Sequence, residues 1–229
     1  MFDFGTRFMD GTALGMWQAN CYVLGDLEAG SCVVIDPGQG AMDFVRQRLA
    51  AREMRCEAVL LTHGHLDHVW AVPDLAAELD VPVLLHPEDR WLWDDPASGI
   101  GATMSQLQAQ FGFDWDPPTE HLDDIRDGQR LTAGGVTLEV RHTPGHTPGS
   151  CVFLLPDLGD DPVLVSGDLL FAGSVGRTDF PRGSMEQQLT SLRTEVLPLP
   201  DETLVAPGHG ETTTVGAERA TNPFLRELV

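Results

Sequence analysis

The chain has 229 residues and is strongly acidic, with 35 Asp and Glu against 14 Lys and Arg, a formal net charge of −21 and a pI near 4.4. Such a charge repels polyanions and argues against nucleic acid as a substrate. An apolar content of 42% and a mean hydropathy of −0.09 are typical of a globular protein, and no apolar run reaches the ~18–20 residues needed to cross a membrane.

The first half of the chain predicts strands and helices in alternation. Short apolar runs predict strands, at 21–24, 32–35, 59–61 and 83–85. Apolar residues near helical spacing predict helices, at 41–54 and 69–79. Pro and Gly interrupt residues 94–118, whose structure the pattern leaves open.

The second half repeats this scheme loosely, without a close sequence repeat. Strands are predicted at 136–140, 151–155, 163–165 and 203–206. A helix is predicted at 185–196, and a short one at 215–220. We therefore expect a single domain over residues 1–229, built from alternating strands and helices.

Four potential metal ligands lie within six residues, at His63, His65, Asp67 and His68. They form an H-x-H-x-D-H run directly after the apolar segment 58–61. A hydrophobic core could not hold all four, because each would need a buried polar partner. At the end of a strand, alternation would point His63 and His65 to the same side. The run predicts a metal site, and the alternative is a polar loop with surface histidines.

Three further candidate ligands follow later strands of the chain. They are His146 in a Pro- and Gly-rich loop, Asp168 directly after an apolar run, and His209 in a Pro-Gly-His-Gly turn. Loops at the carboxyl ends of strands often carry functional sites. A lone histidine after a strand is more often structural, but four ligand-bearing strand ends in one chain predict a two-metal hydrolytic centre.

These motifs resemble the metallo-β-lactamase superfamily, and more narrowly its glyoxalase II-like (hydroxyacylglutathione hydrolase-like) members. The resemblance runs from about Asn20 to Leu225, and its motifs are the H-x-H-x-D-H run, Val34-Ile35-Asp36-Pro37-Gly38, His142–Gly149, Gly176–Gly183 and Asn222–Leu225. It implies an α/β (α+β) fold, a four-layer αββα sandwich with the ligands along one edge. The chain resembles a short form that lacks a C-terminal helical domain, so the thiol-binding contacts of the longer form are not expected here.

The resemblance also implies two divalent metal ions, Zn²⁺ with Fe²⁺ or Mn²⁺ as alternatives, which mixed nitrogen and oxygen ligands suit. The first ion would be held by His63, His65 and His146, and the second by Asp67, His68 and His209. Asp168 would bridge the two ions, and Asp67 and Asp168 are the expected catalytic carboxylates. A metal-bridging hydroxide would attack the substrate, so no serine or cysteine nucleophile is required.

Two residues near the expected site each have two interpretations. Asp36 either orients a ligand histidine from outside the ligand set or belongs to a plain Asp-Pro-Gly turn. Arg177 either binds a substrate carboxylate or forms a structural ion pair with Asp179.

The remaining histidines and the cysteines are not assigned to the site. We expect His142 to be structural, and His86 and His121 to be surface or loop residues. The scattered cysteines are predicted to be buried, reduced thiols, at Cys21, Cys32, Cys56 and Cys151.

The leading functional hypothesis is a thioesterase of glyoxalase II type that cleaves S-acyl conjugates of a small thiol, such as S-lactoylglutathione. The alternative is a persulfide dioxygenase with a single iron at His63, His146 and Asp168, because those enzymes share a similar Gly-Arg-Thr-Asp-Phe stretch. A lactonase or β-lactamase-type hydrolase comes third, and a non-enzymatic metal-binding protein last. The expected partner is a small-molecule thioester, with no nucleic acid or membrane. Residues 1–5 lack the features of a signal peptide, so we expect a cytoplasmic protein.

Overall fold

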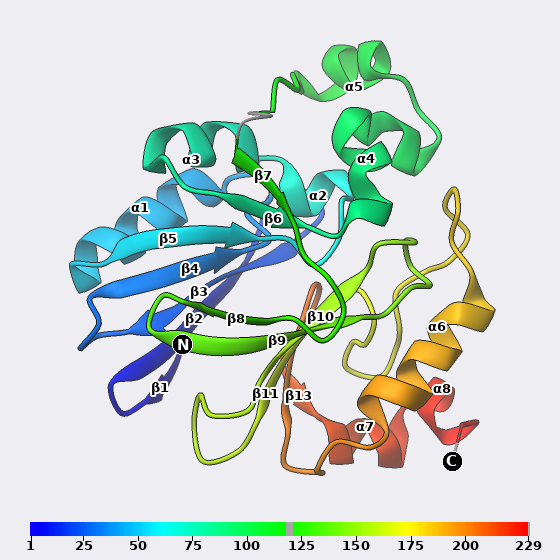
Figure 1. Cartoon of the computed structure of the whole chain (residues 1–229). Coiled ribbons are helices and arrows are strands. Elements are labelled where there is room, and N and C mark those ends of the chain that lie inside the picture. The colour runs from blue at the N-terminus through cyan, green and yellow to red at the C-terminus, as the bar shows by residue number, and fades with distance from the viewer. Residues whose placement is uncertain (118–120, 229) are drawn as a thin grey trace.

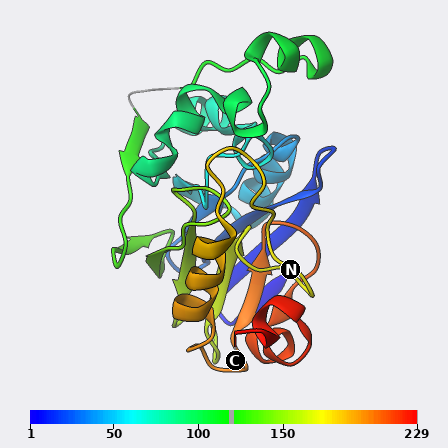
Figure 2. The same cartoon turned by 90° about the vertical axis from the view of Figure 1, so that its right-hand side faces the viewer.

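The structure is a computed structural model that describes residues 1–117 and 121–228, so Pro118, the last residue of the segment left open above, lies outside it. Two β-sheets pack face to face, and helices cover the outer face of each (Figure 1). The expected four-layer αββα sandwich is confirmed. Figure 2 shows the same layers from the side that carries the C-terminal helices.

The first sheet has seven strands in sequence order: β1 (Phe2–Phe4), β2 (Arg7–Leu14), β3 (Ala19–Asp26), β4 (Ser31–Ile35), β5 (Arg55–Leu60), β6 (Val83–Leu85) and β7 (Leu122–Asp124). Strands β1 to β4 pair antiparallel, and β4 to β7 pair parallel. The parallel half requires crossover connections, which bring the carboxyl ends of β4 and β5 to the same edge of the sheet.

The second sheet has six strands in the order β13 (Thr213–Thr214), β12 (Leu204–Pro207), β11 (Val163–Gly167), β10 (Cys151–Leu155), β9 (Val136–His142) and β8 (Arg130–Ala133). Its pairs are antiparallel except β11 with β12. The carboxyl ends of β11 and β12 therefore lie side by side.

The helices are α1 (Ala41–Arg52), α2 (Leu66–Val69), α3 (Val72–Leu79), α4 (Arg90–Asp94), α5 (Met104–Phe111), α6 (Met185–Ser191), α7 (Val215–Thr221) and α8 (Pro223–Arg226). Short 3-10 segments span Pro87–Asp89 and Pro96–Ile100, and a π-helical turn spans Leu192–Val196. None of the helices in the described ranges is both long and apolar enough to span a membrane.

Three layers of apolar side chains hold the four layers of backbone together. One, with Val34 and Val59, packs the first sheet against α1 and α3. A second, with Leu24 and Phe153, fills the space between the sheets. A third packs the second sheet against α6, α7 and α8. Burial of apolar side chains on both faces of each sheet explains why the strands are continuous apolar runs rather than strictly alternating ones.

The structure differs from the expected elements in several places. The helix expected at 69–79 begins only at Val72, as α3, and Val69 ends a separate helix, α2, with Trp70 and Ala71 between the two. The helix expected at 185–196 ends in a π-helical turn. Five strands were not expected, because they are short or carry charged and polar residues among the apolar ones: β1, β2, β7, β8 and β13. The segment left open contains α5, which begins at a capping box formed by Thr103 and Gln106.

One edge of the sandwich collects the loops that carry the candidate ligands. The H-x-H-x-D-H run follows β5, His146 lies between β9 and β10, and Asp168 follows β11. The backbone N–H of Cys151 donates to the carbonyl of Thr62 at 2.7 Å, which joins the two sheets at this edge. Gly208 N–H donates to the Gly167 carbonyl at 2.8 Å, which aligns the loops after β11 and β12.

Candidate metal centre

The first cluster contains the side chains of His63, His65 and His146. One ring nitrogen of each lies within 4.8 Å of the others, and all three rings are buried. The Nδ1 atom of His65 and the Nε2 atom of His146 are 2.8 Å apart. Three imidazole nitrogens that converge in this way form a donor set typical of a divalent transition metal.

The second cluster contains Asp67, His68 and His209, whose ligand atoms also lie within 4.8 Å of one another. Asp67 Oδ2 lies 3.2 Å from His209 Nε2, and His68 Nε2 lies 3.3 Å from His209 Nε2. The structure thus brings together in two groups the six residues that the sequence assigned to two metal ions.

Asp168 lies between the two clusters. Its Oδ2 atom is 3.4 Å from His146 Nε2 in the first cluster. Its Oδ1 atom is 3.5 Å from His68 Nε2 in the second. One carboxylate therefore presents an oxygen to each cluster, which is the position that a bridging ligand requires.

Asp36 also lies within 4.8 Å of histidine nitrogens, those of His63 and His68, but its oxygen atoms are occupied. Asp36 Oδ2 accepts hydrogen bonds from the Thr62 hydroxyl at 2.6 Å and from His68 Nδ1 at 3.1 Å, and Oδ1 accepts from the Thr62 N–H at 2.8 Å. Its backbone has φ = +51°, a left-handed conformation that directs the carboxylate back toward β5. The arrangement fits an orienting residue better than a third metal cluster.

The residues present fit divalent metal ions on two observations. Among the described residues, His63 Nε2 and Asp168 Oδ1 are buried and have no hydrogen-bond partner, which is costly unless a ligand completes them. A Cβ atom at Gly208 would collide with Asp168 Oδ1, so the chain keeps this space free of side-chain atoms. The clusters and the bridging carboxylate could hold two ions.

The pKa values of the histidines differ between the two clusters. Burial, together with the charge of neighbouring histidines, holds the pKa values of His63 and His65 well below the ordinary histidine value. Burial also disfavours the charged form of His68, but Asp67 and Asp168 outweigh it and raise the pKa of His68 to about 10. For His209 burial is likewise outweighed by Asp67 and Asp168, and its pKa is raised. Since a metal needs neutral imidazole, an ion at the second cluster must displace these protons.

Backbone groups fix the other histidines of the site. His146 Nδ1 donates to the carbonyl of Arg177 at 2.7 Å, which directs Nε2 toward the first cluster. His209 Nδ1 lies 3.3 Å from the carbonyl of Gln18. The buried Gln188 donates from Nε2 to the carbonyl of Asp168 at 3.0 Å. Gln188 was not singled out in the sequence, since a polar residue inside a helix has no distinguishing pattern.

A pocket of about 430 Å³ opens beside both clusters and is lined in part by Trp17, Phe171 and Phe180. Trp17 lies in the turn between β2 and β3 and packs against Trp70 and Phe111, with ring centroids 5.8 and 5.5 Å apart. These aromatic residues were not predicted as site residues. The only sequence signal for Trp17 is a large apolar residue in a turn, which by itself is common on protein surfaces.

Arg177 also lines this pocket, but its guanidinium is already paired. Nε and Nη2 contact the two oxygens of Asp179 at 2.6 and 2.7 Å, and the guanidinium lies over the Phe180 ring at 4.0 Å from its centroid. This geometry fits the ion-pair interpretation. Because the pair is exposed to solvent, it contributes little to stability, so a substrate carboxylate could still compete for the guanidinium.

His86 lies in the loop after β6, one of the two positions expected for it, but not at the surface. His86 is buried, with 7% of its surface exposed, and stacks on His142 with ring centroids 4.0 Å apart. His142 Nε2 contacts the Pro148 carbonyl at 2.8 Å, in keeping with a structural role. The prediction for the cysteines is confirmed, because all four are free and buried.

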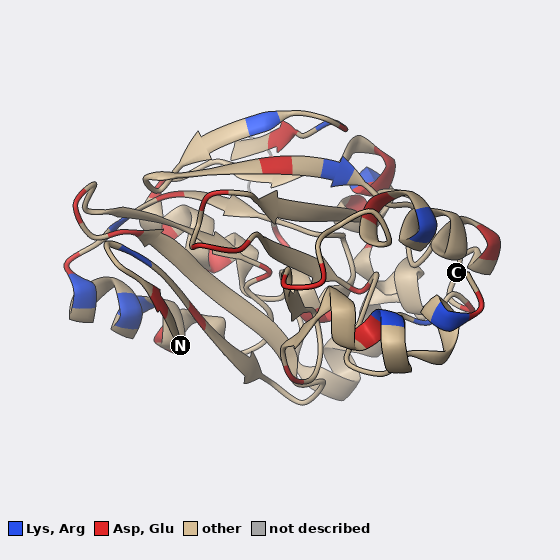
Figure 3. Cartoon of the chain, turned by 90° about the horizontal axis from the view of Figure 1, so that it is seen from below, with Lys and Arg blue, Asp and Glu red and all other residues tan. Residues whose placement is uncertain are grey.

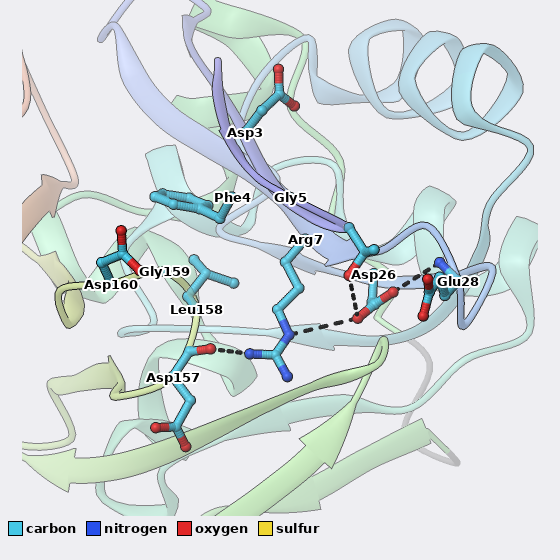
Figure 4. Close-up of a pocket in the computed structure, with 11 residues that line it drawn as sticks. Asp3, Phe4, Gly5, Arg7, Asp26, Glu28, Asp157, Leu158, Gly159 and Asp160 are labelled. Carbon is cyan, nitrogen blue, oxygen red and sulfur yellow. Dashed lines mark hydrogen bonds and ion pairs between the residues drawn. The ribbon is translucent and has the colours of Figure 1, made fainter.

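A separate hollow of about 750 Å³ lies away from the clusters, between β1, β2 and the loop at 157–160 (Figure 4). Acidic residues line it, and Arg7 in its centre contacts Asp26 and the backbone carbonyl of Asp157. Its lining contains no histidine and its cation is already paired, so it offers no donor set with imidazole nitrogens like that of the two clusters.

The chain is similar to known proteins over most of its length. The chain is 36% identical over 213 residues to the hydroxyacylglutathione hydrolase GloC of Haemophilus influenzae, covering 91% of this chain and 93% of that protein. The crystal structure of the BLEG-1 B3 metallo-beta-lactamase has a TM-score of 0.81 and 37% identity, covering 95% of this chain and 99% of the other. The structure of TTHA1623 in a di-iron-bound form has a TM-score of 0.79 and 38% identity, covering 94% and 100%.

The family model of the metallo-beta-lactamase superfamily matches residues 14–209, which include the strands of the first sheet from β3 onward, most of the second sheet and all seven candidate ligands. With the αββα sandwich, the two clusters and these relatives, the chain belongs to the metallo-beta-lactamase superfamily.

Proposed function

We propose that this protein is a dinuclear metal-dependent hydrolase, a thioesterase of glyoxalase II type that cleaves S-acyl conjugates of a small thiol, such as S-lactoylglutathione. The observation that carries the proposal is the position of Asp168, with one oxygen toward each of two complete three-residue clusters. The similarity to GloC supports the substrate class.

Zn²⁺ is our proposed native metal, with Fe²⁺ and Mn²⁺ as alternatives, and the di-iron form of TTHA1623 supports iron as a serious candidate. When bound, two such ions supply a Lewis acid for the carbonyl and lower the pKa of a shared water toward ~7. Asp67 and Asp168 line the pocket beside the clusters and would hold the ions there as carboxylates. Burial acts against the charged form of Asp67, but His68 and His209 outweigh it and lower the pKa of Asp67. Asp36 and the Arg177 carbonyl keep His68 and His146 oriented.

The pocket suits an acyl group with an apolar part. Trp17, Phe171 and Phe180 give it an aromatic wall, and His65, Asp67 and His146 form its floor. We propose that the acyl chain packs on this wall while its carbonyl faces the clusters. Arg177 uses Nε and Nη2 for Asp179, and the remaining N–H donors of its guanidinium would be the ones to bind a carboxylate on the substrate.

The same proposal covers partners and location. Acidic positions are spread over the loops and helices and basic ones are fewer and dispersed (Figure 3), which disfavours a nucleic-acid substrate. We propose a small-molecule thioester as the partner, without nucleic acid or membrane, and the cytoplasm as the location.

The test has two parts, made on protein purified without chelator or affinity tag. Elemental analysis measures the ions per chain, and we expect nearly two. A panel of thioesters, headed by S-lactoylglutathione, then measures thiol release by the protein reconstituted with Zn²⁺, Fe²⁺ and Mn²⁺ in turn. One ion per chain and no thioester cleavage with any of the three metals would reject the proposal.

Two other activities have specific support. BLEG-1 is described as a B3 metallo-beta-lactamase, so β-lactam hydrolysis belongs in the same panel. The Gly176–Phe180 stretch resembles that of persulfide dioxygenases, and residues of this stretch line the pocket. Oxygen uptake with glutathione persulfide, together with close to one iron per chain, would favour the dioxygenase.

A further inference from the structure

Asp89 is a buried carboxylate that the proposed reaction does not use. None of its surface is exposed, and it lies where a 3-10 segment, Pro87–Asp89, meets α4. Aspartate is a favourable residue at the start of a helix, where it usually accepts a hydrogen bond from the first turn. Asp89 makes no such bond to α4, so its carboxylate has another purpose.

The carboxylate instead joins two loops that carry ligands of the first cluster. Oδ2 accepts hydrogen bonds from the Gly64 N–H at 2.9 Å and from the Thr147 hydroxyl at 2.7 Å. Oδ1 accepts from the Gly149 N–H at 2.7 Å. Gly64 lies between His63 and His65, and Thr147 directly follows His146. One side chain thus contacts the immediate neighbours of all three histidines.

Close packing leaves this contact no freedom. A Cβ atom at Gly149 would lie 2.7 Å from Asp89 Cγ, and one at Gly64 would lie 2.7 Å from Leu92 Cβ in α4. Both loops therefore approach the segment around Asp89 at a distance that only glycine permits. A shift of Asp89 would move the two loops relative to each other.

We infer that Asp89 is a positioning residue for the first metal site, which holds the His63–His65 loop and the His146 loop at the separation that metal binding requires. All three of its partners are donors, so the carboxylate is suited to this place and an amide is not. An Asn at this position would direct its NH₂ group at either the Gly149 N–H or the pair formed by Gly64 and Thr147. The inference rests on the proposed metal sites but not on the proposed substrate.

The test measures Zn²⁺ affinity by competition with a chromophoric chelator, using metal-free protein in two backgrounds. His209→Ala weakens the second cluster and leaves the first to be measured, and His65→Ala does the reverse. In the His209→Ala background, Asp89→Asn should raise the Zn²⁺ dissociation constant about 10- to 100-fold, the usual effect of losing a residue that orients ligands. In the His65→Ala background, Asp89→Asn should change the Zn²⁺ dissociation constant by less than about 3-fold, because the contacts of Asp89 flank the first cluster.

Asp10→Asn is the matched control for loss of a buried carboxylate. Asp10 is 2% exposed, pairs with Arg52 at 3.0 Å and lies on β2 outside both clusters. If Asp89→Asn lowers the melting temperature as Asp10→Asn does but leaves the affinity of the first site unchanged, the inference is wrong.

A second pair of variants covers the case in which Asp89→Asn does not fold. Thr147→Val removes one of the three donors and keeps the carboxylate, so it should weaken Zn²⁺ binding at the first site in the same direction. Thr147→Ser keeps the hydroxyl and should restore it. Equal Zn²⁺ affinities of the Thr147→Val and Thr147→Ser variants would also overturn the inference. Because no substrate is used, these results are independent of whether the protein is a thioesterase.

Discussion

His68 Nδ1 and Asp36 Oδ2 are 3.1 Å apart in the interior, where neither residue has more than 2% of its surface exposed. This contact commits Nδ1 of the ring to Asp36 and leaves Nε2 directed at Asp67, His209 and Asp168. Carboxylate partners of this kind fix the tautomer and orientation of metal-binding histidines. The turn that follows β4 thus determines which nitrogen of His68 faces the second cluster.

Asp36→Asn should weaken metal binding at the second cluster by about 10- to 100-fold. An amide that keeps its oxygen on the Thr62 N–H directs its NH₂ group at His68 Nδ1, so the ring loses its acceptor. The measurement is the number of ions retained after dialysis against a limiting chelator. Asp10→Asn controls for stability loss, and equal ion retention by the two variants would contradict the prediction.

His65→Ala should abolish thioester cleavage while leaving the fold intact. The variant removes one nitrogen of the first cluster, and its effect should exceed the about 10- to 100-fold loss expected for a residue outside the ligand set. Circular dichroism, measured together with the kinetics, separates a loss of catalysis from a loss of the fold. A collapsed spectrum would mean that the metal site is needed for folding, and retained activity would remove His65 from the site.

The sequence predicted the two sheets well because most of their strands are buried on both faces and appear as unbroken apolar runs. It did not predict β2, in which Asp10 and Gly11 interrupt the apolar residues, or the separation of α2 from α3. That separation coincides with a contact between segments of the first half that lie 34 positions apart in the sequence. The Ala71 N–H donates to the carbonyl of Pro37 at 3.0 Å, which no local pattern reveals.

The candidate ligands were found because His and Asp at fixed spacing after strands are a dense local signal. The residues that support them carry no such signal. Asp89 has the sequence neighbourhood of an ordinary helix start, and Trp17 that of an ordinary turn. His86 was misjudged because burial by stacking on His142 brings together residues 56 positions apart, which the sequence alone does not show.

Trp17→Ala should raise the KM for thioesters with a bulky apolar acyl group about 2- to 10-fold, the value of one or two aromatic contacts. The kcat and the metal content should change little, because Trp17 contacts the pocket and other aromatic rings. Steady-state kinetics across acyl chains of increasing size provide the measurement. Trp17→Phe keeps an aromatic ring and should lie close to the parent protein. A uniform loss of kcat for all acyl groups would instead place Trp17 in the catalytic machinery.

The stacked pair of His86 and His142 should make the protein sensitive to acid. Burial, and then the charge of His142, lower the pKa of His86 from 6.5 to about 4, although Glu88, Asp124 and Asp127 act in the opposite direction. Between these values the unfolded chain binds a proton that the folded chain does not, so the free energy of unfolding falls as the pH is lowered from about 6.5 to about 4. Above this window the stabilisation is fully present.

His86→Gln removes the titrating group and should flatten the pH dependence in this window by at most about 1.4 kcal/mol per pH unit. Glutamine is uncharged at every pH and keeps an acceptor within reach of the Glu88 N–H, which His86 Nδ1 contacts at 3.4 Å.

The measurement is urea unfolding of metal-free protein at half-unit steps from pH 4 to pH 8, taken as the difference in the free energy of unfolding between parent and variant. His121→Gln, a change at a histidine outside the stack, is the control, and its free energy of unfolding should follow that of the parent. Because His63 and His65 also bind protons less readily when folded, part of the slope should survive in His86→Gln. If the free energies of unfolding of the parent and of His86→Gln change in parallel with pH, the buried stack does not govern acid sensitivity.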